Sequence, residues 1–309
     1  MEKRILIAVD GSIYSRKAIE YTVRMESVIK GLNYILLNIQ PKISEFLIED
    51  ARRDGKARSA LKDVSSKNQE NSIKILNEAK SIMTKLGVDE KQIETFSQPV
   101  VRGTAKAILD YGKQSLCDTI VLGRRGVSRL AEAFTGSVTN GVLEHTNVTP
   151  VWAIGGEVIS SKIMIAIDGS ESALRAVDHV IYMVGDNPDI QVTLLHVTPR
   201  LRDYCTIEFD DEGDILEDVI TQGNKRCVDS FYVHAQKRFE EAGIEEGQIE
   251  IKQVTSTINI GKTIVNEAKK GDFGTVVVGR RGANDSFFMG SVSRHVLTNA
   301  SDCAVWLVP

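Results

Sequence analysis

Short apolar runs alternate with amphipathic stretches along the whole chain, which predicts strands alternating with helices. A strand buried on both faces is a short continuous apolar run, whereas a helix repeats its apolar residues about every 3.6 positions. In the first half these patterns predict strands at Arg4–Val9, Tyr34–Ile39, Ile93–Ser97, Thr119–Leu122 and Val151–Ile154. They predict helices at about Ser15–Met25, in the stretch that ends near Leu86, at Thr104–Ser115 and at Ser137–His145.

The second half repeats this order of elements. Its predicted strands are Ile163–Ile167, Val192–Val197, Ile249–Val254, Thr275–Val278 and Ala304–Val308, and its predicted helices are Ser172–Met183, Asn224–Ala242, Lys262–Lys269 and Ser291–Asn299. Such alternation is typical of an α/β fold in which helices cover both faces of a five-stranded parallel sheet. Two stretches, 41–70 and 199–222, have little periodicity, and we expect variable loops or extra helices there.

Equivalent residues recur at a nearly constant spacing, which indicates a duplicated domain. Asp10 corresponds to Asp168 at an offset of 158 residues, and Trp152 corresponds to Trp306 at an offset of 154. A chain of 309 residues suits two domains of about 150 residues each. We therefore expect one domain at residues 1–157 and a second at 158–309, with a linker at Gly155–Ser161.

The last strand of each half is apolar throughout, as Val151–Ile154 and Ala304–Val308 show. A free sheet edge of this kind invites pairing with another strand. The two halves are therefore predicted to pack as a pseudo-twofold pair through these strands, and a homodimer of the whole chain is a further expectation.

Composition narrows the classes of partner. The formal net charge of −4 offers no basic surface for nucleic acid or for an acidic membrane. No apolar run approaches the length of a membrane span, and the N-terminal sequence does not read as a signal peptide. The four cysteines lack metal-binding or redox spacing and are expected to be inert thiols, so a cytoplasmic location is predicted.

A glycine motif occurs once in each half, between a predicted strand and a predicted helix. In the first half it has the form G-x2-G-x9-G-S, with Gly123, Gly126, Gly136 and Ser137. Glycines allow a ligand to approach the backbone closely, and the free N–H groups at a helix N-terminus attract anions. The motif therefore indicates a phosphate site, although a tight turn with a serine cap would look similar. It is not a Walker A loop, because no Gly-Lys-Ser/Thr follows.

Asp10 and Asp168 follow the first strand of each half, where a carboxylate can accept a hydrogen bond from a ribose or a base. The alternative is a local Asp-Gly turn or a helix cap. Arg124 and Arg125, with Arg280 and Arg281, lie inside the glycine loops and are expected either to contact phosphate or to be solvated loop charges. The five histidines do not cluster in sequence, and no catalytic nucleophile or base is identified, so at most slow turnover of a bound ligand is expected.

The chain resembles universal stress proteins of the tandem type, which carry two such domains in one polypeptide. The resemblance covers nearly the whole chain and rests on ILIAVDGS and IMIAIDGS, on LLNIQP and LLHVTP, and on the two glycine loops. It implies two Rossmann-like domains of the adenine nucleotide alpha hydrolase-like type that bind ATP with Mg²⁺. Asp10 and the main chain of Ile39 would contact the adenosine. The phosphates would be held by Gly123, Gly126, Gly136, Ser137, Val138 and Thr139.

The second half departs from the family motif, because its loop is two residues shorter. The equivalent site residues remain, namely Asp168, Val197, Gly279, Gly282, Gly290 and Ser291. Phe287, Phe288 and Met289 precede Gly290, so the second site is predicted to bind more weakly, to prefer ADP or AMP, or to stay empty. The competing interpretations are a nucleotide-independent interaction module of the same fold and an ATP-using enzyme of the PP-loop or electron-transfer flavoprotein type.

Overall fold

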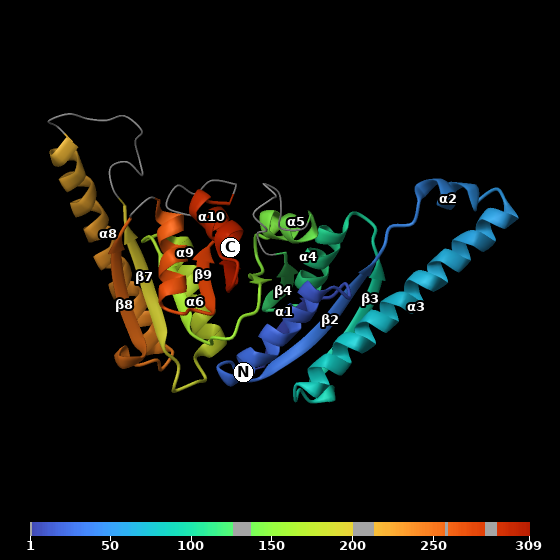
Figure 1. Ribbon diagram of the computed structural model, residues 1–309, viewed down its shortest axis with the longest axis horizontal. Coiled ribbons are helices and arrows are strands. Elements are labelled where there is room, and N and C mark those ends of the chain that lie inside the picture. The colour runs from blue at the N-terminus through green and yellow to red at the C-terminus, as the bar shows by residue number, and fades with distance from the viewer. Residues whose placement is uncertain (1, 126–136, 200–212, 257–258, 282–288) are drawn as a thin grey trace.

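The computed structural model describes residues 2–125, 137–199, 213–256, 259–281 and 289–309 (Figure 1). The strands are β1 (Lys3–Ala8), β2 (Leu32–Gln40), β3 (Ile93–Pro99), β4 (Thr119–Arg124), β5 (Val151–Gly155), β6 (Ile163–Ile167), β7 (Val192–Thr198), β8 (Ile249–Thr255), β9 (Thr275–Gly279) and β10 (Ala304–Val308). The main helices are α1 (Ile13–Arg24), α2 (Glu45–Asp50), α3 (Gly55–Lys85), α4 (Thr104–Gln114), α5 (Ser137–His145), α6 (Glu171–Val184), α8 (Gly213–Glu241), α9 (Ile260–Lys270) and α10 (Ser291–Asn299). Short 3-10 turns lie at Met25–Ser27, Glu90–Gln92 and Glu246–Gln248.

The strands form one continuous sheet in the order β3-β2-β1-β4-β5-β10-β9-β6-β7-β8. Within each half every strand pair is parallel, as predicted, and each half contributes five strands. The two halves meet where β5 pairs antiparallel with β10, so the predicted pairing of the last strands is confirmed. The two five-stranded sheets predicted from the sequence are therefore joined into a single ten-stranded sheet.

Helices cover both faces of this sheet because its central strands are buried and apolar on both sides. In β1, Ile5 and Ile7 pack in one hydrophobic cluster with residues of α1, α3, α6 and α8, whereas Leu6 packs in the other cluster with residues of α4, α5, α9 and α10. This alternation follows from the two-residue period of a strand.

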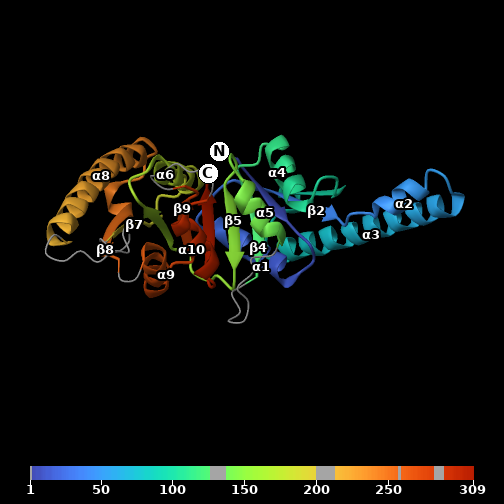
Figure 2. The same ribbon diagram turned by 90° about the horizontal axis from the view of Figure 1, so that it is seen from above.

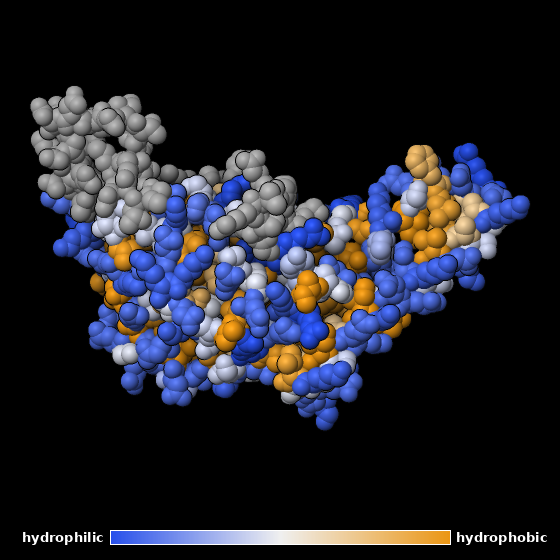
Figure 3. All heavy atoms as spheres, in the orientation of Figure 1, coloured by the Kyte–Doolittle hydropathy of each residue, from blue (hydrophilic) through white to orange (hydrophobic). Residues whose placement is uncertain are grey.

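Helix α3 is longer than its sequence pattern indicates, and its N-terminal part projects beyond the sheet with α2 (Figures 1 and 2). Its buried residues, Ser72, Leu76, Ala79 and Met83, all belong to its C-terminal half. Amphipathic periodicity therefore marks only that half, and much of the stretch 41–70 is the extra helix allowed for above. Phe46 on α2 is 81% exposed, and Figure 3 shows apolar residues gathered on this projecting arm.

Candidate functional site

A cavity of about 320 Å³ lies at the carboxyl ends of β1, β2 and β4. The strand order reverses between β1 and β4. Ligands of open α/β sheets bind at such a reversal, which is called the switch point. Five residues predicted from the sequence line it, namely Asp10, Ile39, Gly123, Val138 and Thr139. The fold thus brings together, at the predicted place, residues that are up to 129 positions apart in the chain.

The lining of the cavity combines apolar and polar groups. Leu37, Ile39, Ile108 and Leu122 supply aliphatic surface from β2, α4 and β4, whereas Asp10, Ser12, Ser15 and Arg125 supply polar groups. Small-molecule pockets typically have volumes of roughly 300–1,000 Å³ and combine apolar walls with a few polar groups. The cavity fits this description, and its aliphatic wall suits a flat base.

Asp10 forms the local turn and also faces the cavity. Its Oδ1 accepts a hydrogen bond from the N–H of Ser12 at 3.0 Å, across Gly11, whose φ is +77°. Burial raises the pKa of Asp10, but hydrogen bonds from Ser12 and Ser15 outweigh this effect and the pKa lies below its ordinary value. The carboxylate is therefore held ionised. The two roles that the sequence predicts for Asp10, a ligand contact and a local turn, are compatible.

Asn38 of β2 lies on the face of the sheet opposite the cavity and hydrogen-bonds to the backbone at the end of β1. Its Nδ2 donates to the carbonyl of Val9 at 2.6 Å, and Ser72 of α3 donates to its Oδ1 at 2.6 Å. In the second half, the Nδ1–H of His196 donates to the carbonyl of Ile167 at 3.1 Å, which is the equivalent contact. Buried polar networks of this kind give rigid local geometry, so the backbone beside each aspartate is fixed.

Gly123 is required for a close backbone contact, which the sequence does not reveal. A Cβ atom there would lie 2.2 Å from the carbonyl oxygen of Tyr14 and 2.8 Å from the amide nitrogen of Ser15. The end of β4 therefore touches the backbone of the first turn of α1. A Cβ at Gly279 would likewise meet Ser172, so the glycine is needed for close packing in both halves.

The first turn of α5 approaches the same glycine. The hydroxyl of Thr139 donates to the carbonyl of Gly123 at 3.1 Å, and Ser293 donates to the carbonyl of Gly279 at 2.6 Å in the second half. Helix α5 begins at Ser137, the predicted phosphate-binding serine. Gly126 and Gly136 lie outside the described residues. The described part of the loop thus places the N-terminus of α5 beside the cavity.

The two arginines of the first loop have different surroundings. Arg125 is exposed and lines the cavity, as expected for a phosphate contact or a solvated charge. Arg124 is only 1% exposed and points into the junction of the halves, where its Nη1 donates to the carbonyl of Leu297 at 2.6 Å. Both expectations for Arg124 are therefore wrong. The recurrence of the arginine pair in both glycine loops was the sequence signal that could have indicated a structural role for Arg124.

In the second half the predicted residues that the structure describes occupy equivalent places. Asp168 accepts a hydrogen bond from the N–H of Ser170 at 3.0 Å, and Val197 is buried at the end of β7. Gly290 caps α10, which begins at Ser291, but its N–H donates to the carbonyl of Arg280 at 2.9 Å. Met289 packs against the hydrophobic cluster that contains Val197. Gly282, Phe287 and Phe288 lie outside the described residues.

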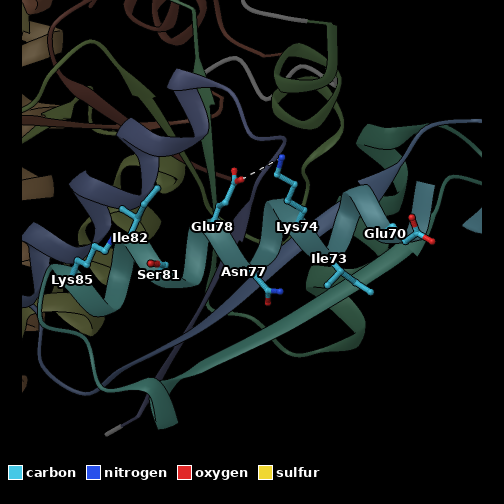
Figure 4. A pocket seen from close by; sticks show the side chains of 8 residues that line it. All are labelled: Glu70, Ile73, Lys74, Asn77, Glu78, Ser81, Ile82 and Lys85. Carbon is cyan, nitrogen blue, oxygen red and sulfur yellow. Dashed lines mark ion pairs between the residues drawn. The ribbon is translucent and has the colours of Figure 1, made fainter. Parts of the chain in front are cut away.

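A wider hollow of about 680 Å³ runs along the outer side of α3 (Figure 4). Its lining comes from α3 alone and includes the ion pair of Lys74 with Glu78, whose atoms are 4.0 Å apart. It lies away from the switch point and contains none of the predicted site residues, so it is not the candidate site.

Other site classes find no support within the described ranges. No group of three or more His, Cys, Asp or Glu side chains is arranged there to hold a metal ion. In the same part of the chain, no helix has the length and apolar character needed to cross a membrane. Cys117 and Cys303 are buried in the core, as expected of inert thiols, whereas Cys227 is exposed.

The chain is similar to known proteins in sequence and in fold. Universal stress protein YxiE of Bacillus subtilis is 27% identical over 145 residues, which are 46% of this chain and 92% of that protein. The crystal structure of a universal stress protein from Archaeoglobus fulgidus has a TM-score of 0.64 at 20% identity and covers 99% of this chain and 97% of its own. A universal stress protein family protein of Arabidopsis thaliana, solved with AMP bound, has a TM-score of 0.34 at 18% identity, covering 49% of this chain and 90% of its own.

The sequence pattern of the Universal stress protein family matches residues 1–155 and again residues 160–309. Together the two matches span almost the whole chain. The chain therefore belongs to the universal stress protein family, with the family domain present twice in one polypeptide.

Proposed function

We propose that the first half binds an adenine nucleotide, ATP together with Mg²⁺, in a stress-response or signalling role with at most slow hydrolysis. The observation that carries this proposal is the cavity at the switch point, which gathers Asp10, Ile39, Gly123, Val138 and Thr139. Membership of the universal stress protein family supports it. Asp10 and Ile39 would contact the adenosine, and the N-terminus of α5 would face the phosphates.

The residues present suit such a ligand. The aliphatic wall formed by Leu37, Ile39 and Leu122 can take the base, and Arg125 lies where a guanidinium can meet phosphate oxygens. Gly126, Gly136 and Ser137 would complete the phosphate site. Mg²⁺ usually binds through substrate phosphates and one or two carboxylates, so no dedicated cluster of protein ligands is needed.

Four expectations from the sequence remain proposals. They are the domain boundary at residues 157 and 158, a weaker or ADP- or AMP-preferring second site, a homodimer and a cytoplasmic location. The alternative function, a nucleotide-independent interaction module, is favoured by one observation, the exposed Phe46 on the arm formed by α2 and α3.

Calorimetric titration of the full chain with ATP, in the presence of Mg²⁺, separates the two functions. Binding with a loss of at least about tenfold in Asp10→Ala would support the nucleotide site, because a lost charge-assisted hydrogen bond costs about 1.5–3 kcal/mol. A folded chain that shows no heat with ATP, ADP or AMP would refute the proposal and favour the interaction module.

A further inference from the structure

Two equivalent arginines cross between the halves in opposite directions. Arg124 follows Gly123 in the first half, and its guanidinium donates to the carbonyls of Leu297 and Ala300 at the end of α10. Arg280 follows Gly279 in the second half, and its Nη2 donates to the carbonyl of Glu144 in the last turn of α5 at 2.5 Å. Each half therefore holds the C-terminal end of the other half's last helix.

The chemistry of a helix end explains why arginine stands at these positions. The last four carbonyls of a helix have no partner within the helix, and the C-terminus carries partial negative charge. A guanidinium satisfies such carbonyls with several donors and a compensating charge. A second contact reaches the same place, because Arg294 of α10 lies 3.9 Å from the carboxylate of Glu144.

Burial makes these contacts rigid. Arg124 is 1% exposed and Arg280 is 5% exposed, and burial lowers the pKa of both groups. A guanidinium nevertheless keeps its charge at all ordinary pH values. If either side chain left its carbonyl acceptors, a buried charge would lose its hydrogen bonds, which is costly. The position of each helix end is therefore fixed by a residue of the opposite half.

The other end of each helix lies at a candidate nucleotide site. Helix α5 begins at Ser137 beside the first cavity, and α10 begins at Ser291 in the second half. Each helix has nine residues and is about 13 Å long. A helix of this length moves as a rigid body, so a shift at its C-terminus also displaces its N-terminus. The orientation of α5 toward the first site thus depends on Arg280, which belongs to the second half.

We propose that Arg280 and Arg124 are positioning residues, each of which aligns the phosphate-facing helix of the nucleotide site in the opposite half. This inference rests on the proposed function. Arg280 acts on the first site through α5, which meets the phosphates but not the base. Its removal therefore weakens the binding of ATP and spares the binding of adenosine, whereas general loss of stability would not discriminate between these ligands.

The test compares ATP and adenosine affinities of the full chain by calorimetry in Arg280→Leu. The affinity for ATP at the first site should fall roughly two- to thirtyfold, the range of mutations that alter coupling between sites. Adenosine affinity should stay unchanged. Arg238→Leu is the matched control, because Arg238 is a half-exposed arginine of the second half whose ion pair with Asp178 stays within that half. Its ATP-to-adenosine ratio should equal that of the unmodified chain.

The outcomes separate this inference from the proposed function. If the unmodified chain binds neither ligand, the proposed function is wrong and the inference falls with it. If the unmodified chain prefers ATP and folded Arg280→Leu keeps the same preference, only the inference is overturned. Should Arg280→Leu fail to fold, Arg280→Gln, a neutral donor of shorter reach, is judged by the same ratio: a fall supports the inference and an unchanged ratio overturns it.

Discussion

Trp152 and Trp306 stack face to face at the centre of the molecule, with ring centroids 4.0 Å apart and planes inclined by 2°. Both are fully buried, and they are register partners in the antiparallel pairing of β5 with β10. They are equivalent residues of the two halves, so the stack marks the pseudo-twofold axis. The junction is therefore part of the core and not a loose contact between two domains.

Each indole N–H in this stack finds its acceptor in the opposite half. Nε1 of Trp152 donates to Nε2 of His179 at 3.1 Å, and Nε1 of Trp306 donates to the hydroxyl of Tyr21 at 2.9 Å. Tyr21 and His179 are themselves equivalent positions, at the offset of 158 residues. The two halves thus use different acceptors, an imidazole and a phenol, for the same buried indole N–H. Each of the two hydrogen bonds can therefore be tested separately.

Tyr21→Phe should destabilise the chain by about 1–3 kcal/mol, because it leaves the buried N–H of Trp306 without its acceptor. It also removes the hydrogen bond of Tyr21 with Thr275, which is 2.7 Å long. The free energy of unfolding is measured by urea denaturation. Tyr111→Phe is the control, because that ring is half-buried and stacks on Phe96 at the surface. Equal losses in both variants would contradict the role of Tyr21.

His179 should make stability fall in mild acid. Burial lowers its pKa to about 3, whereas in the unfolded chain the pKa is near 6.5. Below pH 6.5 the unfolded chain therefore binds a proton that the folded chain does not take up until about pH 3. The free energy of unfolding should drop by about 2 kcal/mol between pH 7 and pH 5 from this group alone.

His179→Gln keeps an acceptor for Trp152 but removes the titrating group. Its loss of stability between pH 7 and pH 5 should be smaller than that of the unmodified chain by this same amount. Burial also lowers the pKa of His196 and of His295, but these groups contribute equally to both proteins. Identical pH profiles would show that His179 does not carry the effect.

The strands and the switch point were predictable from the sequence because local patterns determine them. A continuous apolar run such as Thr119–Leu122 identifies a strand buried on both faces, and the repeat of the glycine loop gives the connection that follows it. Asp10 and Gly123 follow from these two signals, since they lie at the ends of adjacent strands, whereas Ile39 was predicted only from the family resemblance. The apolar character of β5 and β10, together with the family resemblance, likewise predicted their pairing.

Long-range polar contacts were not predictable, because no local pattern encodes them. Arg124 is charged and lies in a glycine loop, which favours solvent or phosphate, yet its partners are backbone carbonyls more than 170 residues away. The N-terminal part of α3 lies beyond the sheet and contacts α2, so it has none of the buried residues that mark the C-terminal half of the helix. Ser12 and Ser15 also line the cavity, and only the first turn of α1 brings them there.

Gly123→Ala should destabilise the chain by about 1–3 kcal/mol, the usual cost of overpacking. The added methyl group would lie 2.2 Å from the carbonyl oxygen of Tyr14, and a backbone atom cannot rotate away. Gly55→Ala is the matched control, since no atom lies within 4 Å of its added Cβ and the helix α3 begins there. It should be neutral or stabilise by about 0.4–1 kcal/mol. A common midpoint of urea unfolding for the two variants would refute the close contact.

The two nucleotide sites should be unequal, and matched aspartate variants of the full chain can show it. Asp10 and Asp168 each accept an N–H at 3.0 Å in the same turn, so replacing either by alanine has a similar structural cost. In the second half the Gly290 N–H donates to the carbonyl of Arg280 and Met289 packs against the core, so neither is available to phosphates. Calorimetry should therefore give one tight ATP site that Asp10→Ala weakens at least about tenfold and Asp168→Ala leaves unchanged. Asp168→Ala should instead affect a weaker site that prefers ADP or AMP, if that site fills. Two sites of equal affinity and equal preference, each lost with its own aspartate, would show that the shortened loop makes no difference.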